Sequence, residues 1–139
     1  RATDIAALSK AVNDLGIQLV VVGPEGPLAD GIVDHFRKMG IPVFGPTQAA
    51  AQIEASKAFS KALFQKYGIP CAQSSTFSDL AAAKDYVKHK GAPLVIKADG
   101  LAAGKGVIMA ETLDEALQAV SSIIESKSLG SAGEKVVIE

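Results

Sequence analysis

Lys97-Ala98-Asp99-Gly100-Leu101-Ala102-Ala103-Gly104-Lys105-Gly106-Val107 is the most informative stretch of this sequence. Its glycines allow backbone N–H groups to approach a phosphate closely and to adopt positive φ angles. Lys97 and Lys105 place positive charge beside those glycines. The run therefore predicts a cradle for the phosphates of a nucleotide. The alternative is a hairpin loop whose glycines serve its turns and whose lysines are solvated.

The spacing of these glycines excludes two common nucleotide-binding loops. A P-loop has four residues between its glycines, followed by Gly-Lys-Ser/Thr and a helix. Here three residues separate Gly100 from Gly104, and Gly106 rather than a hydroxyl residue follows Lys105. A dinucleotide-binding G-x-G-x-x-G is also excluded, because Met109 occupies the last glycine position.

The segments on both sides of the glycine-rich run are apolar. Residues 93–97 precede it and residues 107–110 follow it, and both are rich in β-branched residues that favour strands. We therefore expect a strand–loop–strand flap that can close over a nucleotide. Lys97 ends an apolar strand, where a solvated lysine is less expected, and this position favours the phosphate-binding interpretation.

The rest of the second half alternates between strand and helix patterns. Thr112 and Glu115 have the spacing of a capping box and predict the start of a helix. The other predicted elements are a strand at 75–77, a helix at about 79–90 and a last strand at 135–138. The order is β-α-β-β-α-β, which is typical of a split-βαβ sandwich.

The first half predicts an α/β fold of the doubly wound type. Residues 1–46 read as α-β-α-β: a helix ended by Gly16, a buried strand at 17–22, a helix closed by Gly40 and a short strand at 42–44. The Pro/Gly-rich residues 23–27 read as a turn. Beyond residue 47 the composition shifts to strong helix formers, up to Tyr67.

Composition and charge exclude several classes of protein. The 139 residues suffice for one compact domain or two small lobes. Fourteen basic against fifteen acidic residues exclude a nucleic-acid binder that relies on bulk charge. A single cysteine excludes an intrachain disulfide and argues against a thiolate zinc site. No apolar run reaches the length of a transmembrane helix, so a membrane partner is not expected.

Lys57 follows Ser56 at the predicted start of a helix. A cation there opposes the helix dipole, which favours anions at the N-terminus. A bound phosphate would resolve this conflict; the alternative is an exposed, solubilising lysine.

Polar residues follow the predicted strands. Gly23 and Glu25 come after the strand at 17–22, and ligands of open α/β sheets bind at the carboxyl ends of strands. Gly45 follows the next strand and would lie at the same edge if the strands are neighbours. Glu139 ends the last strand, where its carboxylate could face a nucleotide. The alternatives are a rigid turn at 23–27 and a solvent-facing Glu139.

Taken together, these motifs resemble the phosphoribosylamine–glycine ligase (glycinamide ribonucleotide synthetase) family of the ATP-grasp superfamily. The similarity spans nearly the whole chain and rests on Val20-Val21-Val22-Gly23-Pro24-Glu25-Gly26-Pro27-Leu28-Ala29, Val43-Phe44-Gly45-Pro46-Thr47, Ser56-Lys57-Ala58-Phe59, Gly68-Ile69-Pro70 and the run 97–107.

The resemblance implies a reaction and a set of site residues. ATP phosphorylates the carboxylate of glycine, and the amine of 5-phosphoribosylamine attacks the acyl phosphate, with Mg²⁺ or Mn²⁺ assisting. The implied products are glycinamide ribonucleotide, ADP and phosphate, formed in the cytoplasm during purine synthesis. The resemblance assigns to ATP binding Lys57, Lys97, Asp99, Gly100, Ala102, Ala103, Gly104, Lys105, Gly106 and Glu139, and to the phosphoribosylamine site Gly23, Pro24 and Glu25.

The resemblance also implies a domain organisation. Residues 1–48 correspond to part of a Rossmann-like (pre-ATP-grasp) N-terminal domain, 49–70 to a helical linker that starts the ATP-grasp domain, and 71–139 to its lid subdomain, truncated at its C-terminal end. The chain opens at Arg1 rather than Met and ends inside an apolar segment, so we expect a fragment of a longer chain.

The family's metal ligands are expected beyond residue 139, so we predict that the 139 residues alone are inactive. Rival interpretations are a carboxyaminoimidazole ribonucleotide synthetase, a biotin carboxylase and a non-catalytic nucleotide-sensing module.

Overall fold

The computed structural model describes residues 1–102, 104, 106–125, 130 and 132–139. These residues divide into two compact units, Arg1–Ala55 and Ser56–Glu139. Each unit has its own hydrophobic core, and each is described by itself.

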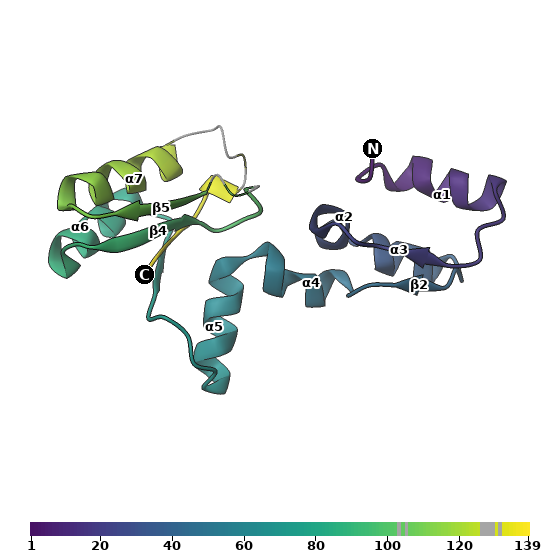
Figure 1. Cartoon of the computed structure of the whole chain (residues 1–139), viewed down its shortest axis with the longest axis horizontal. Helices are drawn as coiled ribbons and strands as arrows, with labels where there is room; N and C mark the ends of the chain where they lie inside the picture. The colour runs from purple at the N-terminus through teal and green to yellow at the C-terminus, as the bar shows by residue number, and fades with distance from the viewer. Residues whose placement is uncertain (103, 105, 126–129, 131) are drawn as a thin grey trace. The chain divides into compact units, whose positions relative to one another are not determined.

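The second unit contains the predicted β-α-β-β-α-β order, which is confirmed (Figure 1). It begins with helix α5 (Lys57–Tyr67), and continues with β3 (Ser75–Phe77), α6 (Leu80–Lys90), β4 (Leu94–Ala98), β5 (Val107–Ala110), α7 (Leu113–Glu125) and β6 (Val136–Ile138).

The strands of this unit pair in the order β3-β6-β4-β5, and every pairing is antiparallel. Strands β3 and β4 therefore run parallel, with β6 between them, and α6 connects them. Strands β5 and β6 are likewise parallel, with β4 between them, and α7 connects them. The sheet thus consists of two interlocked split-βαβ units.

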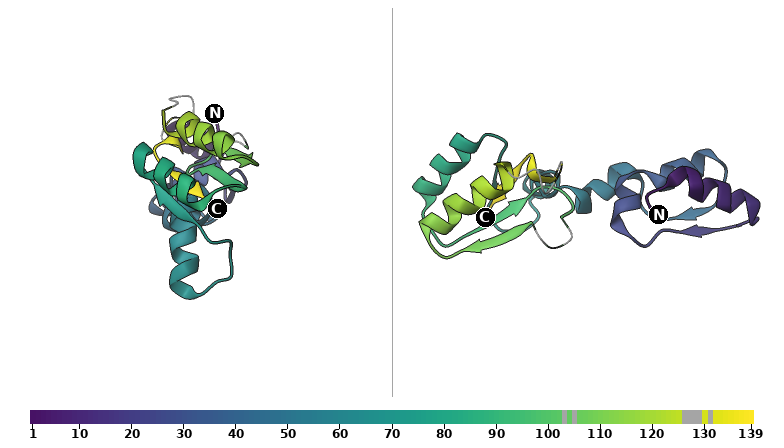
Figure 2. Two further views of the ribbon diagram at one scale, coloured as in Figure 1. Left: turned by 90° about the vertical axis from the view of Figure 1, so that its left-hand side faces the viewer. Right: turned by 90° about the horizontal axis from the view of Figure 1, so that it is seen from above.

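Alternation along β4 fixes which face of the sheet is buried. Leu94, Ile96 and Ala98 are buried, whereas Val95 and Lys97 are only half-buried. The buried side chains pack into a core with α6 and α7, which lie along the strands (Figures 1 and 2). Because successive side chains point to opposite faces, Lys97 lies on the face away from these two helices.

Local signals set the ends of the helices. The Ser56 side chain accepts the N–H of Phe59 at the start of α5, and Asp79 caps α6 through the N–H of Ala82. The predicted capping box of α7 is confirmed, because the N–H of Glu115 donates to Thr112 Oγ1 and the N–H of Thr112 to Glu115 Oε2, each at 3.3 Å. Each such cap stabilises a helix by about 1 kcal/mol.

The first unit packs helices against a small parallel strand pair. Its elements are α1 (Ile5–Asp14), β1 (Val20–Val21), α2 (Glu25–Ala29), α3 (Ile32–Lys38), β2 (Val43–Phe44) and α4 (Gln48–Ala55). Strand β1 pairs with β2 in register Val20 to Val43, and the core forms around Val12, Val33 and Phe36.

Two predictions for this unit are wrong in detail. The strand expected at 17–22 is reduced to β1, and it is not buried on both faces. The N–H of Ile17 still bonds to Val12 at the end of α1, and Leu19 and Val21 are exposed while Val20 packs on the core. In the described residues the helices cover one face of this strand pair, so a continuous apolar run does not become a doubly buried strand.

The second correction concerns residues 23–27, which form the start of a helix rather than only a turn. Pro24 is the N-cap of α2, and Pro27 lies in its first turn. A proline is tolerated there because the first N–H groups of a helix have no intrahelical partner. The observed order over residues 1–46 is therefore α-β-α-α-β, not α-β-α-β.

Candidate functional site

The carboxylate of Asp99, at the end of β4, lies at the N-terminus of α5. Ser56 Oγ donates to Asp99 Oδ1 at 3.0 Å, and the N–H of Ala58 donates to the same oxygen at 2.7 Å. A carboxylate is favourable here because the helix dipole places partial positive charge at this end. The anion expected at the start of this helix is thus supplied by the chain itself.

Lys57 lies against the start of the glycine-rich loop. Its ammonium donates to the carbonyl of Gly100 at 3.1 Å, and its backbone N–H donates to the carbonyl of Asp99, also at 3.1 Å. The side chain is half-buried rather than freely solvated. The structure therefore brings Lys57, Asp99 and Gly100 together, as expected if they belong to one site.

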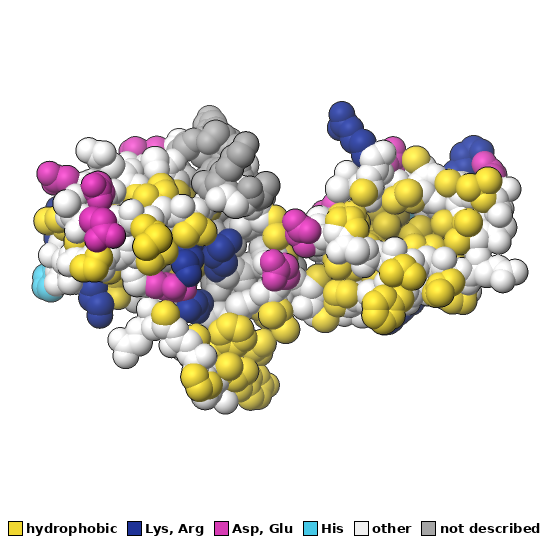
Figure 3. Space-filling model, in the orientation of Figure 1, with side chains coloured by type: hydrophobic (Ala, Val, Ile, Leu, Met, Phe, Trp, Pro, Cys, Tyr) yellow, Lys and Arg dark blue, Asp and Glu magenta, His cyan; other side chains and the backbone are white. Residues whose placement is uncertain are grey.

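Lys97, Glu139 and Lys61 form a second group on the face of the sheet away from α6 and α7. Lys97 Nζ lies 2.6 Å from Glu139 Oε2, and Lys61 Nζ lies 2.7 Å from Glu139 Oε1. The backbone pairs Lys97 with Val137, so Lys97 and Glu139 are diagonal neighbours on one face. Figure 3 shows basic and acidic side chains adjacent to each other on the visible face of this unit.

The charge state of Glu139 follows from these neighbours. Burial alone would raise the pKa of its carboxyl, but hydrogen bonds and charges from Lys61 and Lys97 outweigh burial and lower the pKa below its ordinary value. Glu139 is therefore ionised at neutral pH. The alternative of a solvent-facing Glu139 does not hold, because its side chain is 12% exposed and each of its carboxylate oxygens contacts a lysine.

The loop positions occupied by glycine require this residue for different structural reasons. A Cβ on Gly100 would lie 2.8 Å from the Cβ of Ala132, and a Cβ on Gly106 would lie 2.7 Å from that of Ala102. These two glycines allow the chain to pack closely. Gly104 has a φ of +79°, which disfavours other residues, and no atom of the described residues lies within 4 Å of where its Cβ would be. Ala103 and Lys105, both expected in this site, lie outside the described residues.

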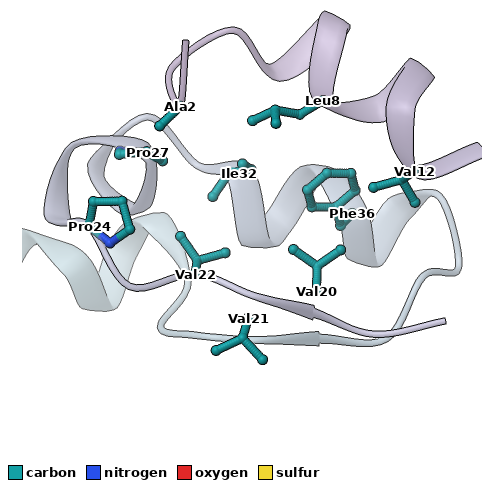
Figure 4. Close-up of a pocket in the computed structure, with 10 residues that line it drawn as sticks. All are labelled: Ala2, Leu8, Val12, Val20, Val21, Val22, Pro24, Pro27, Ile32 and Phe36. Carbon is teal, nitrogen blue, oxygen red and sulfur yellow. The ribbon is translucent and has the colours of Figure 1, made fainter. Parts of the chain in front are cut away.

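Gly23, Pro24 and Glu25 lie at the carboxyl end of β1, in the first unit, and are exposed. Because β1 and β2 are parallel, this end also carries Gly45, as expected. Pro24 lines an apolar hollow bordered by α1, β1 and α3 (Figure 4). Val20 and Val22 point into that hollow, whereas Val21 points to the opposite side of the strand.

Models of known protein families match both units of the chain. The model of the phosphoribosylglycinamide synthetase N domain matches residues 1–54, and that of the phosphoribosylglycinamide synthetase ATP-grasp (A) domain matches residues 55–139. The chain belongs to the phosphoribosylglycinamide synthetase family. The resemblance derived from the motifs is thereby confirmed.

Curated relatives agree with this assignment to the phosphoribosylglycinamide synthetase family. The phosphoribosylamine–glycine ligase of Vibrio cholerae is 53% identical over 137 residues, which are 99% of this chain and 32% of the relative. That of Neisseria meningitidis serogroup B is 61% identical over 123 residues, 88% of this chain and 29% of the relative. The chain spans about a third of the length of these relatives.

Solved structures share the fold. Phosphoribosylamine–glycine ligase from Thermotoga maritima matches with a TM-score of 0.70 and 28% identity, covering 94% of this chain and 32% of that one. Biotin carboxylase from Campylobacter jejuni has a TM-score of 0.81 at 24% identity, covering 99% and 31%. The second likeness shows the fold alone. The α/β fold of ATP-grasp type is confirmed.

Sequence reasoning missed one residue of the candidate site, Lys61. It was not among the residues selected from the motifs, yet it contacts Glu139. A signal was present, because Lys61 lies four residues after Lys57 and such residues share a helix face. The partner, however, is far away in the sequence.

The described residues do not fit a metal site of their own. In the described part of the chain, no group of three His, Cys, Asp or Glu side chains is placed to hold a metal ion. The acidic side chains of the site are instead engaged, Asp99 with α5 and Glu139 with Lys61 and Lys97. Among the same described residues, no helix is both long enough and apolar enough to cross a membrane.

Proposed function

We propose that this chain contributes the nucleotide-binding part of a ligase that joins glycine to 5-phosphoribosylamine at the expense of ATP. The products are glycinamide ribonucleotide, ADP and phosphate, formed in purine biosynthesis. The observation that carries the proposal is the 53% identity to a phosphoribosylamine–glycine ligase over 99% of this chain. Two further observations support it: Lys57 contacts Gly100 of the loop, and Lys97, which contacts Glu139, comes just before the loop in the sequence.

In this proposal the lysines bind phosphate. Lys57 and Lys97 contact the phosphates of ATP, and the loop 100–106 covers them. Ammonium groups held in place by the fold stabilise the charge on the transferring phosphoryl group without further reorganisation. Glu139, which directly follows β6, borders the nucleotide. Asp99 has a positioning role in this proposal. Its carboxylate fixes the start of α5 and thereby holds Lys57 in place.

The chemistry proceeds in two balanced steps. A carboxylate oxygen of glycine attacks the γ-phosphorus, the bond to the β-phosphate oxygen breaks, and ADP leaves. The amine of 5-phosphoribosylamine then attacks the acyl carbon, phosphate leaves, and the nitrogen loses a proton. Gly23, Pro24 and Glu25 border the phosphoribosylamine in this proposal. Mg²⁺ or Mn²⁺ would supply charge neutralisation on ATP, and we assign it no ligand among the described residues.

Glycine-dependent formation of ADP by the full-length gene product, with 5-phosphoribosylamine present, tests the proposal. We expect ADP to accumulate only when all three substrates are supplied. Lys97→Met should abolish ATP binding, measured by calorimetry. Lys88→Met removes an exposed lysine that pairs with Asp85, and it should bind ATP as the unaltered protein does. ADP formation that does not depend on glycine would contradict the proposal.

We further propose that the 139-residue chain by itself has no ligase activity, because it spans about a third of its relatives. Turnover of glycine and phosphoribosylamine by these residues alone would refute this.

A further inference from the structure

Lys61 is held more firmly than Lys97, although both contact Glu139. Lys61 Nζ donates to Glu139 Oε1 at 2.7 Å and to the carbonyl of Ala72 at 3.0 Å. Its side chain is 15% exposed. One acceptor, Glu139, follows β6, and the other, the carbonyl of Ala72, lies in the segment after α5. This ammonium is therefore held from two directions.

Lys97 is held less firmly than Lys61. In the described part of the chain its ammonium has one ion-pair partner, Glu139 Oε2 at 2.6 Å, and its side chain is 24% exposed. It also stands directly before the glycine-rich loop, since β4 ends at Ala98. Of these two cations, Lys97 is therefore the one that can change partners when an anion arrives.

The charges of the group decide whether such an exchange is favourable. Lys61, Lys97 and Glu139 sum to +1, so the group retains one positive charge for a phosphate. Without Lys61 the sum would be zero. Glu139 would then have Lys97 as its remaining partner in the group, and a phosphate would have to compete with that carboxylate for the same ammonium.

We propose that Lys61 is a positioning residue that neutralises Glu139 and thereby releases Lys97 to a phosphate of the nucleotide. This inference rests on the proposed function, because it assigns the released ammonium to ATP. Lys61 itself does not touch the nucleotide. It acts through Glu139, whose two oxygens are divided between the two lysines.

Charge-balanced variants of the full-length gene product test this. Lys61→Met should weaken ATP binding at least tenfold in calorimetry, whereas Lys61→Arg should stay within about threefold of the unaltered protein. The double variant Lys61→Met with Glu139→Gln restores the sum of +1 and should regain most of the lost affinity. Adenosine, which has no phosphate, should bind all variants alike.

Each alternative result has a defined meaning. Unchanged ATP affinity of Lys61→Met would overturn the inference, and so would a double variant that binds no better than Lys61→Met. Equal losses for ATP and adenosine would point to a structural role and would also overturn it. If Lys61→Met fails to fold, Lys61→Gln takes its place, because the amide can still donate a hydrogen bond. Failure of the unaltered protein to bind ATP would instead contradict the proposed function.

Discussion

The carboxylate of Asp99 accepts the backbone N–H of Ala58 at 2.7 Å and so joins the end of β4 to the start of α5. The same carboxylate accepts the hydroxyl of Ser56, and the backbone N–H of Asp99 donates to the carbonyls of Ala132 and Lys135. A single residue thus ties the glycine-rich loop to the helix that carries Lys57.

Asp99→Ala should destabilise the second unit by about 1–3 kcal/mol, because it leaves a partly buried hydroxyl and an N–H without their acceptor. Amide hydrogen exchange at Ala58 measures this locally and should accelerate. Asp99→Asn keeps one acceptor oxygen and should lose less. Asp85→Ala removes an exposed ion pair and should change stability by less than about 0.5 kcal/mol. Unaltered protection of Ala58 in Asp99→Ala would contradict the contact.

Gly106→Ala should also destabilise the second unit, by about 1–3 kcal/mol, because the added methyl would lie 2.7 Å from the Cβ of Ala102 and 3.0 Å from that of Ala98. Urea unfolding measures the loss. Combining it with Ala102→Gly removes the closest clash and should recover part of the stability. Gly23→Ala is the matched control, because in the part of the chain that the structure describes no atom lies within 4 Å of its added methyl. Equal effects of Gly106→Ala and Gly23→Ala would argue against the packing explanation.

Glu139 should make the stability of the second unit depend on pH. Its pKa is lowered in the folded state, so the unfolded state binds more protons as the pH falls. The stabilisation is therefore complete above the ordinary pKa of a glutamate and is lost as the pH falls through the lowered value. We expect the difference in melting temperature between the unaltered chain and Glu139→Gln to be largest near pH 7 and to shrink on acidification. A difference that stays constant from pH 7 to 3 would contradict the ion pairs.

Lys57→Met should reduce ATP affinity at least tenfold while changing stability little, since among the described residues its ammonium donates to a single carbonyl, that of Gly100. The affinity is measured by calorimetry on the full-length gene product, and the stability by thermal unfolding. Lys66→Met is the control and should bind ATP normally. Lys66 lies on the same helix, but it is exposed and its ammonium lies over the ring of Tyr67. Similar affinities of the two variants would remove Lys57 from the phosphate site.

The order of elements in the second unit could be read from the sequence because its signals are local. The apolar run ending at Lys97, the capping pair Thr112 and Glu115, and Asp79 before α6 each act within a few residues. The first unit was harder to read. Whether the run at 17–22 is buried depends on how many layers cover it, and Pro24 is compatible with both a turn and a helix start.

The sequence indicates candidate site residues but not the contacts between them. Lys57, Lys97 and Gly100 were selected by their chemistry, and their assignment to ATP stays a prediction. The partners of Asp99 and Glu139 could not be selected in this way, because Ser56 and Asp99 are 43 positions apart and Lys97 and Glu139 are 42 apart. Gly100 and Gly106 were assigned to phosphate approach, whereas the structure gives them a packing reason that depends on Ala132 and Ala102.

The placement of β6 has a consequence for synthesis of the protein on the ribosome. Among the described strands of the second unit this one comes last in the sequence, yet it lies between β3 and β4. Until residues 136–138 have left the exit tunnel, β3 lacks β6, its partner strand in the described sheet. Strand β4 then has only β5, of these described strands, to pair with. Strands β3 and β4 must therefore stay available after their own synthesis, and the described sheet forms completely only when β6 is inserted between them.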